Sequence, residues 1–550
     1  MDFYPNLCRV LMGVSVLTSW GITLPASSVY AAGMSERDSN TMEAFEETEV
    51  TQQRIDDIQS LREKGIDPYG GRYERSHTTA RAIQLFLDSE DPSAEKFESP
   101  PVCLAGRLMG KREMGKAIFG DLHDLDGHVQ LYFKKNDFTP EVFEEIVKAL
   151  NLGDIIGVEG PLFRTRTGEI TLHVREVTVL SKVINNLPPL KETTDEAGHI
   201  HRFFQFADVE MRYRQRYLDL ILNRDVRDHF RKRSRMVSIF RRELDQMGYM
   251  EVETPMMHHI AGGAAARPFI THHNALDIDL YLRIAPELHL KRLIVGGMEA
   301  VYEINRNFRN EGISIKHNPE FTMLEAYKAY GDRDTVMELC EHLVSTAVED
   351  MFGGHQVAYQ GITLDFKRPW KRISMIDAIH EVVGIELDLH APLADLLEKT
   401  RGLGIDTTDL TTHGKIINAV FEEKVEESLI QPTFIIDYPT EISPLARQKK
   451  DDPDLVERFE LFIYGRETAN GFSELNDPAE QYRRFEEQLA QRQGGDQEAH
   501  PMDLDYVNAL RCGMPPAGGI GIGIDRLAMI LTDSASIRDV ILFPLLRPKE

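Results

Sequence analysis

Residues 102–183 alternate between apolar and polar side chains in short runs, and this stretch constrains the fold more than any other part of the sequence. A period of two indicates strands that bury one face. A helix-like run at residues 140–150 follows the third strand. The five runs that predict strands are residues 102–107, 117–119, 129–133, 155–160 and 170–174. We therefore expect a small β-barrel that forms a domain of its own, residues 99–185.

Five strands with a helix after the third are the pattern of an OB-fold barrel, which binds single-stranded nucleic acid on its middle strands. The charge of this segment fits that role. Residues 99–185 hold 11 basic and 12 acidic side chains, whereas the whole chain holds 63 and 89, for a net charge of −26. Such acidity excludes a protein that binds nucleic acid through bulk positive charge. A nucleic-acid partner should therefore contact the near-neutral barrel.

The chain around the barrel divides by composition. Its 550 residues suggest two to four domains, and a hydrophobic content of 42% excludes a disordered chain. Residues 34–98 hold 16 acidic and 8 basic side chains, with apolar residues at helical spacing, which predicts a helical arm. The polar residues 186–205 predict a linker. Residues 206–550 mix long helices with strands, so we expect an α+β domain there.

The N-terminus allows two interpretations. Arg9 precedes an apolar stretch, and residues 29–31 resemble a small-x-small cleavage site, which is the pattern of a secretory signal. Alternatively, residues 1–33 are an upstream extension, and Met34 is the working start. We favour the second interpretation, because the rest of the chain has the composition of a cytoplasmic protein.

The four cysteines support a reducing compartment. They lie far apart and include no CxxC pair, so we expect no structural zinc and no disulfide framework. No apolar run after the N-terminal segment is long enough to span a membrane. These observations predict a cytoplasmic protein without a membrane partner.

Three blocks of sequence beyond the barrel contain candidate functional residues. For two of them, the residues alone predict the local structure. The first block is a helical stretch, residues 231–247, followed by a strand that ends at Pro255. The third block, residues 518–527, places four glycines before Arg526 at the start of a helix. Glycines let the backbone approach a ligand closely, and an arginine there can reach a phosphate or lie on an aromatic base.

The second block, residues 308–327, consists of two strand-like runs joined by a polar loop. Arg309 lies at the end of the first run, where its guanidinium can bind a phosphate through two parallel hydrogen bonds. Phe321 offers a surface on which a base can stack. Taken alone, this block could equally be an ion-paired surface hairpin.

In this order the three blocks resemble motifs 1, 2 and 3 of class II aminoacyl-tRNA synthetases. The barrel resembles the anticodon-binding domain of the subclass that handles Lys, Asp and Asn. Residues 261–327 and 465–476 look specifically like the lysyl-tRNA synthetase family, and the resemblance covers roughly residues 50–549. It implies an α+β multidomain fold, with an N-terminal OB-fold β-barrel and an antiparallel-sheet catalytic domain flanked by helices.

The resemblance also implies a two-step reaction. ATP and L-lysine would form lysyl-adenylate and pyrophosphate, and the lysyl group would then pass to the 3′ end of tRNA(Lys). Arg309 would bind the α-phosphate and the amino-acid carboxylate, and Arg526 would cover the adenine face opposite Phe321. The catalytic residues would be Arg309 and Arg526, and the ATP-binding residues Arg309, Glu311, His317, Phe321 and Arg526.

The resemblance places a metal in the same site. No Walker-type lysine is present to neutralise the pyrophosphate, so Mg²⁺ would be the cofactor. Glu460 and Glu467 match the family's metal-binding carboxylates, and Mg²⁺ prefers such hard oxygen ligands.

Lysine specificity requires carboxylates that pair with an ammonium group and stay unpaired when a neutral analogue binds. Glu474 and Glu325 are the candidates for the side-chain ammonium, with a hydroxyl contact from Tyr327 and an apolar wall from Phe472. Residues 470–474 supply an acid and no base, which favours lysine over aspartate. The complete predicted lysine-binding set is Gly263, Glu287, Glu325, Tyr327, Asn470, Phe472 and Glu474.

The resemblance extends to the anticodon and to assembly. The residues that match anticodon-reading positions are Arg112, Phe119, Gln130 and Glu169, which combine an aromatic ring with polar groups for reading unstacked bases. Motif 1 implies a homodimer, although its cluster of Arg231, Lys232, Arg233 and Arg235 could also be a solvated face or a contact to the tRNA backbone.

Two other functions compete with a lysyl-tRNA synthetase. One is a synthetase-like ligase that lysylates a protein, but such paralogues lack the anticodon barrel. The other is a nucleic-acid-binding protein with a degenerate synthetase body. Degeneration would remove Arg309, Arg526 or the pair of Glu460 and Glu467, and all four are present.

Overall fold

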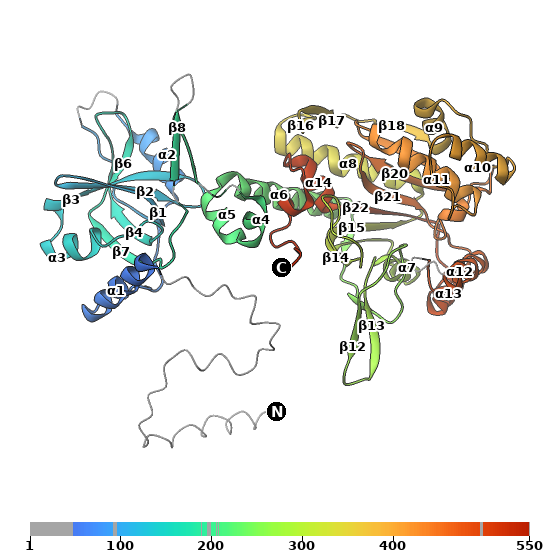
Figure 1. Cartoon of the computed structure of the whole chain (residues 1–550), viewed down its shortest axis with the longest axis horizontal. Coiled ribbons are helices and arrows are strands. Elements are labelled where there is room, and N and C mark those ends of the chain that lie inside the picture. The colour runs from blue at the N-terminus through green and yellow to red at the C-terminus, as the bar shows by residue number, and fades with distance from the viewer. Residues whose placement is uncertain are drawn as a thin grey trace, which may run out of the picture. The chain divides into compact units, whose positions relative to one another are not determined.

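The computed structural model of the chain describes residues 48–91, 96–188, 190–194, 200–204, 206, 208–494 and 499–548. The chain divides between Pro188 and Pro189 into two compact units (Figure 1). The predicted extension, residues 1–33, lies outside the described residues. Within the described part, no helix has both the length and the apolar character needed to cross a membrane.

The first unit contains the predicted barrel. Its strands are β1 (Val102–Met114), β2 (Ala117–His123), β3 (His128–Lys134), β4 (Ile155–Gly160), β5 (Leu162–Arg164), β6 (Ile170–His173) and β7 (Glu176–Ser181). They pair in the order β5-β6-β3-β2-β1-β4-β7. Alternate residues such as Val129, Leu131 and Phe133 are buried in its core. The five expected strands are present, and the structure adds the three-residue β5 and the six-residue β7.

Two helices precede the barrel and account for the described part of the helical arm. They are α1 (Glu49–Glu63) and α2 (Thr79–Ser89), and each begins after a threonine whose side chain accepts a backbone N–H. Ala82 and Phe86 of α2 pack into the barrel core. The helix expected at residues 140–150 is irregular, because a short helix, α3 (Pro140–Val142), continues into a π-helical turn, η2 (Phe143–Val147). A 3₁₀ turn, η1 (Lys135–Asp137), precedes them.

The second unit is built on an eight-stranded sheet in the order β10-β14-β15-β22-β21-β20-β19-β18. The two end pairs are parallel, and every pair between them is antiparallel. The strands are β10 (Met250–Glu251), β14 (Ala300–Phe308), β15 (Glu320–Ala329), β18 (Lys371–Ser374), β19 (Thr433–Pro439), β20 (Leu455–Phe462), β21 (Glu467–Ser473) and β22 (Ala517–Gly523). The three sequence blocks contribute β10, the hairpin of β14 and β15, and β22.

Smaller strands lie outside this sheet. Residues expected as a linker contain a hairpin of β8 (Leu190–Thr194) and β9 (Ile200–Phe204). A three-stranded sheet contains β11 (Met257–His258), β12 (Ile270–His273) and β13 (Ile278–Leu282), and a second hairpin contains β16 (Gln356–Tyr359) and β17 (Ile362–Asp365).

Helices cover the sheet in this unit. They are α4 (Val209–Arg214), α5 (Arg216–Leu222), α6 (Arg224–Gln246), α7 (Glu287–Val295), α8 (Arg333–Phe352), α9 (Met375–Val383), α10 (Leu393–Gly402), α11 (His413–Lys424), α12 (Pro478–Gln493), α13 (Leu504–Arg511), α14 (Ile524–Leu531) and α15 (Ile537–Val540). Two 3₁₀ turns are η3 (Glu426–Ser428) and η4 (Thr440–Ile442). The helix of the first block, α6, ends before Gly248, whose φ of 81° suits glycine.

The two faces of the sheet have different roles, because side chains alternate along each strand. On one face, apolar residues such as Leu324, Ile520 and Leu461 form a core with α6, α8 and α14. The other face carries Glu325, Asn470 and most of the predicted lysine-binding residues. Helices also cover part of this second face, since residues of β18, β19 and β20 pack with α9 and α11, and residues of β14 and β15 pack with α7 and α13.

Candidate active site

Strand register brings the predicted lysine-binding residues together on one face. Glu325 on β15 pairs with Gly521 on β22, Gly521 pairs with Asn470 on β21, and Asn470 pairs with Glu460 on β20. The next row on the same face joins Tyr327, Gly519, Phe472 and Arg458 in the same strand order. Residues up to about 200 positions apart in sequence are thus direct neighbours.

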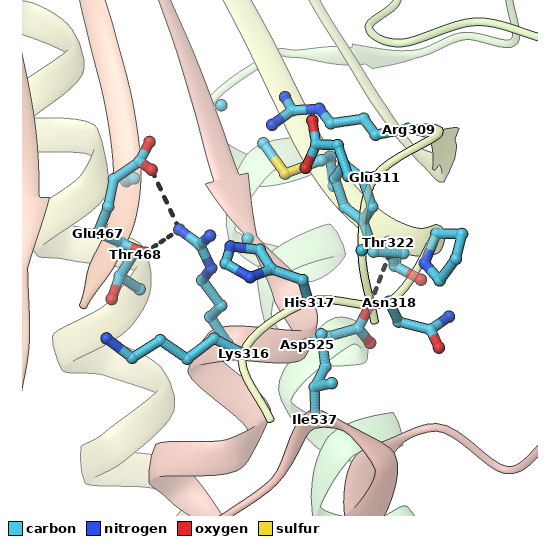
Figure 2. A pocket seen from close by; sticks show the side chains of 18 residues that line it. Arg309, Glu311, Lys316, His317, Asn318, Thr322, Glu467, Thr468, Asp525 and Ile537 are labelled. Carbon is cyan, nitrogen blue, oxygen red and sulfur yellow. Dashed lines mark hydrogen bonds and ion pairs between the residues drawn. The ribbon is translucent and has the colours of Figure 1, made fainter. Parts of the chain in front are cut away.

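The predicted ATP-binding residues line one cavity beside these rows (Figure 2). All five contribute: Arg309, Glu311, His317, Phe321 and Arg526. Figure 2 shows Glu467 on one side of the cavity and Arg309 with Glu311 on the other, while His317 lies between them. Gly521 also lines the cavity and pairs opposite Glu325, so the cavity adjoins the lysine rows.

Arg309 has the features of an anion-binding group. Its buried Nε has no hydrogen-bond partner among the described residues. Burial lowers the pKa of the guanidinium, and the carboxylates of Glu467 and Glu311 oppose that change. Its Cζ lies 5.1 Å from the ring centroid of Phe321. An unpartnered cationic N–H in a cavity favours a bound anion such as a phosphate or a carboxylate.

Arg526 is tied to the opposite wall of the cavity. Its Nη1 donates to the backbone oxygen of Glu467 at 2.6 Å and to the Glu467 Oε2 at 3.1 Å. His317 lines the same cavity, and burial followed by the charge of Arg526 lowers its pKa below the ordinary value. A neutral imidazole next to two arginines can donate its one ring N–H to an anionic ligand.

Carboxylates converge on a second hollow that shares His317, Glu467 and Arg526 with the first. Its carboxylates are the predicted Glu460 and Glu467 together with Glu422 and Glu426. Burial raises the pKa of Glu460 to about 7, against the charge of Arg458, and the charge of Glu467 raises it further. Burial also raises the pKa of Glu422 and of Glu426, and Glu467 adds to both. Clustered carboxylates that raise one another's pKa are stabilised in their ionised form by a hard divalent cation, which prefers such oxygen ligands.

The predicted lysine-binding carboxylates are deeply buried. Exposure is 7% for Glu287, 5% for Glu325 and 1% for Glu474. Burial and the charge of Glu287 raise the pKa of Glu325 to about 8. The Tyr327 hydroxyl donates to Glu325 Oε2 at 3.1 Å. Three buried carboxyl groups whose charges raise one another's pKa favour a cationic ligand.

Asn470 connects this set to the carboxylate hollow. Its Oδ1 accepts a hydrogen bond from Arg458 Nε at 3.1 Å, and Arg458 Nη2 lies 2.5 Å from Glu460 Oε1. Arg458 also takes part in the second row of the sheet face, opposite Phe472. We did not predict Arg458, although its position two residues before Glu460 on a strand places both on one face.

Lys291 is a second residue that the sequence analysis missed. It is fully buried on α7, and its Nζ contacts Glu287 Oε1 at 2.6 Å and also contacts Glu474 Oε2. Burial opposes the charge of Lys291, but the carboxylates of Glu287 and Glu474 outweigh burial and raise the pKa of the ammonium. The spacing of four residues from Glu287 on a helix was the available signal. Residues 470–474 themselves contain an acid and no base, as noted from the sequence, and α7 adds a base to the pocket.

Glycines make room for these side chains. A Cβ on Gly519 would lie 2.0 Å from Glu474 Oε1 and 2.4 Å from the Tyr327 ring. Gly263 has a φ of 92°, and a Cβ there would lie 3.2 Å from the Cβ of Glu287. We expected the glycines of the third block to admit a ligand, and Gly519 admits protein side chains instead.

In the barrel, three of the predicted anticodon residues share a surface. Arg112 on β1 pairs opposite Phe119 on β2, and Phe119 pairs opposite Tyr132 on β3. Gln130 lies two residues before Tyr132, on the same outward face, and accepts a hydrogen bond from Thr171 at 3.0 Å. Glu169 lies in the exposed turn before β6.

An aromatic cluster covers this face of the barrel. The ring centroids of Phe119 and Tyr132 lie 5.1 Å apart, and Tyr132 also packs against Phe163 and His173. Rings on an outward β-sheet face offer stacking surfaces for unpaired bases. Tyr132, Phe163 and His173 were not predicted, although the alternation of β3 signals an outward Tyr132.

A largely antiparallel sheet that brings these three blocks together beside an arginine-lined cavity, in a chain with an OB-fold barrel, defines a class II aminoacyl-tRNA synthetase. Residues 208–547 match the family described as tRNA synthetases class II (D, K and N), and residues 102–180 match the OB-fold nucleic acid binding domain. The chain belongs to this class II synthetase family. The predicted family and fold class are therefore confirmed.

Curated relatives cover almost the whole chain. The lysine–tRNA ligase of Carboxydothermus hydrogenoformans is 52% identical over 509 residues, which are 92% of this chain and all of that protein. The lysine–tRNA ligase of Pelotomaculum thermopropionicum is 52% identical and covers 91% of this chain and 96% of its own. The lysine–tRNA ligase of Bacillus subtilis is 48% identical and covers 94% of this chain and all of its own.

Proposed function

We infer that the chain is a lysine–tRNA ligase, which activates L-lysine with ATP and transfers the lysyl group to tRNA(Lys). The observation that carries this inference is the group of three buried carboxyls, Glu287, Glu325 and Glu474, beside a cavity that contains Arg309. Relatives that are about half identical over nine tenths of the chain bear the name lysine–tRNA ligase.

We assign the first chemical step to the cavity. The lysine carboxylate attacks the α-phosphate of ATP, and negative charge grows on the phosphate oxygens. Arg309 would stabilise that charge, because its buried N–H has no other partner among the described residues. Arg526 and Phe321 would enclose the adenine, and Glu311 and His317 would contact the nucleotide as well.

Mg²⁺ fits the hollow beside this cavity. Glu460 and Glu467 would hold it, and Glu422 and Glu426 add to the negative potential. When bound, Mg²⁺ neutralises the charge of the leaving pyrophosphate. Arg526 would exchange part of its bond to Glu467 for a bond to the nucleotide.

The lysine substrate fits the adjoining rows of the sheet. Glu287 and Gly263 would hold the α-amino group, and Asn470 would contact the carboxylate. Glu474, Glu325 and Tyr327 would bind the side-chain ammonium, and Phe472 would pack against the stem. A neutral analogue would leave these buried carboxylates unpaired, which supports discrimination.

We propose that residues 99–185 form the anticodon-binding domain and residues 206–550 the catalytic domain. Arg112, Phe119, Gln130 and Glu169 would read the anticodon. Residues 34–98 would form the arm, and residues 186–205 would connect the domains. Because the substrate is tRNA, we place the reaction in the cytoplasm.

We also propose a homodimer. Apolar side chains are exposed near the edge strand of the catalytic sheet and on the small three-stranded sheet: Met250, Met257 and Ile270, at 54%, 56% and 65%. A second copy would cover such a surface. Sedimentation equilibrium of the purified protein measures this directly.

The function is tested by ATP–pyrophosphate exchange with each standard amino acid, followed by aminoacylation of total tRNA. We expect exchange that depends on lysine and on Mg²⁺, and lysine transfer to tRNA. Exchange with aspartate, or none with any amino acid, would refute the assignment. A ligase that lysylates a protein would show exchange but no charged tRNA.

A further inference from the structure

Lys291 places an ammonium group of the protein inside the pocket that we propose for the ammonium groups of the substrate. It reaches from α7 to Glu287 one turn earlier on the same helix, and to Glu474, the residue after β21. Its Nζ also lies 5.2 Å from the ring centroid of Phe472, the proposed wall for the substrate stem. Lys291 and both carboxylates are buried, so solvent screening is weak at all three.

Each carboxylate uses one oxygen for this contact. Lys291 takes Oε1 of Glu287 and Oε2 of Glu474. The other oxygen of Glu474, Oε1, is buried and has no hydrogen-bond partner among the described residues. We propose that Lys291 is a positioning residue for lysine specificity: it fixes one oxygen of Glu287 and one of Glu474 and leaves the second oxygen of each for the substrate. The proposal rests on the proposed function of the pocket.

The charges support this division. In the lysine-bound state, with Glu287, Glu325 and Glu474 ionised and Lys291 protonated, the protein side of the pocket carries two negative charges that need two positive ones. Free lysine brings two ammonium groups, one at each end of its stem, and its own carboxylate is left for Asn470 and the arginine beside it. Without Lys291 the third carboxylate has no counter-charge, so one carboxyl must stay protonated and is lost as an ammonium ligand.

The surroundings define the expected pH response. The charged or titratable groups that interact with Lys291, Glu287 or Glu474 come from several elements: Glu325 and Tyr327 of β15, Tyr506 of α13, Arg458 of β20, and His500. Burial raises the pKa of Glu287 and of Glu474, and Lys291 lowers both. Removing the ammonium therefore raises both pKa values further, and lysine binding should need a higher pH.

The test compares Lys291→Met, which removes the charge, with Lys291→Gln, which keeps hydrogen-bonding capacity without the charge. Arg292→Met is the matched control, because Arg292 is the next residue of α7 and pairs with Asp503 and Asp505 instead. Lysine and ATP are varied separately in ATP–pyrophosphate exchange between about pH 6 and pH 9. Titration calorimetry with lysine in the absence of ATP measures the affinity for lysine separately from the reaction.

We expect both Lys291 variants to raise the KM for lysine by at least about tenfold. The acid limb of kcat/KM for lysine should move to higher pH, while the KM for ATP stays within about twofold of wild type. Arg292→Met should change neither quantity. A Lys291 variant with wild-type ATP KM, wild-type lysine KM and an unmoved acid limb overturns the proposal.

A second experiment uses only the wild-type enzyme and two lysine analogues. Pentane-1,5-diamine has two ammonium groups and no carboxylate, whereas norleucine has one ammonium group and one carboxylate. The diamine should compete with lysine and norleucine should compete at least about tenfold more weakly. Equal inhibition contradicts the charge count. Absence of lysine-dependent exchange in the wild type refutes the proposed function instead, and calorimetry with lysine then still reports on Lys291.

Discussion

Arg233 on α6 donates through Nη2 to Asp525 Oδ1 of α14 at 2.8 Å, while the other oxygen of Asp525 accepts the backbone N–H of Thr322 on β15 at 2.7 Å. Arg233 also donates to Thr322 Oγ1 at 3.0 Å. One buried carboxylate therefore joins the first, second and third sequence blocks. Arg233 was a candidate for a solvated face or a tRNA contact, and the structure gives it this internal role.

Replacing Arg233 by Met should destabilise the second unit. Asp525 is 2% exposed, so its charge would lose a partner in a site that water hardly reaches. The expected cost is about 3 kcal/mol, visible as a lower melting temperature by calorimetry. Arg241→Met is the control, because Arg241 of the same helix pairs with the exposed Glu251 and should cost under about 1 kcal/mol. Equal losses in the two variants would contradict a special role for Arg233.

Replacing Arg309 by Met should abolish most of the activation step. A lost donor to developing negative charge costs about 3 kcal/mol, which slows ATP–pyrophosphate exchange roughly 100-fold or more. Arg306→Met serves as the comparison. Arg306 lies on β14, which ends just before Arg309, is 3.6 Å from Glu320, and is not among the residues lining the cavity. Exchange that survives the loss of Arg309 would remove it from the mechanism.

Replacing Glu474 by Gln should impair the use of lysine far more than the use of ATP. The amide keeps the shape of the side chain but cannot neutralise an ammonium group, so the KM for lysine should rise about 10- to 100-fold. Steady-state exchange with each substrate varied measures both constants. Glu480→Gln is the control, because Glu480 pairs with Arg483 and Arg484 on α12. Equal damage to the two substrates would refute the assignment of Glu474.

Lysine binding should strengthen as pH rises toward 8. Burial and the charge of Glu287 raise the pKa of Glu325 to about 8, so this carboxyl is largely protonated in the empty enzyme at pH 7. An ammonium ligand favours its ionised form, and binding then releases a proton. The KM for lysine should fall by at most about tenfold per pH unit below 8 and level off above it. Glu325→Gln should remove this part of the pH dependence.

The Mg²⁺ concentration that the enzyme needs should also depend on pH, again because a buried carboxyl has a raised pKa. Burial, with a further contribution from Glu467, raises the pKa of Glu460 to about 7, and a bound cation must displace that proton. The Mg²⁺ concentration for half-maximal exchange should therefore fall between about pH 6 and pH 8. Glu460→Gln should raise that concentration and flatten its pH dependence, and removal of divalent ions with EDTA should stop exchange. Exchange that persists in EDTA would contradict the metal assignment.

Sequence alone predicted the parts of this molecule whose signals are local. The strands of the barrel follow from period-two alternation, and the three blocks give the hairpin of β14 and β15, the helix α6 and the turn before Arg526. The sequence did not identify three residues of the site, Lys291, Glu422 and Arg458. Each can be assigned to the site only once strand register or helix packing shows which distant carboxylate lies next to it. Lys291 faces Glu474 across 183 positions of sequence, a relationship that no local pattern contains.

β22 lies in the middle of the catalytic sheet, between β15 and β21, yet it is made of residues 517–523 near the end of the chain. During synthesis the two halves of the sheet have no strand to join them until this segment leaves the ribosome. Glu325 and Asn470 then become neighbours across Gly521 in one late event. We therefore expect truncation before β22 to abolish the whole proposed site rather than one residue of it, because β22 joins its two halves.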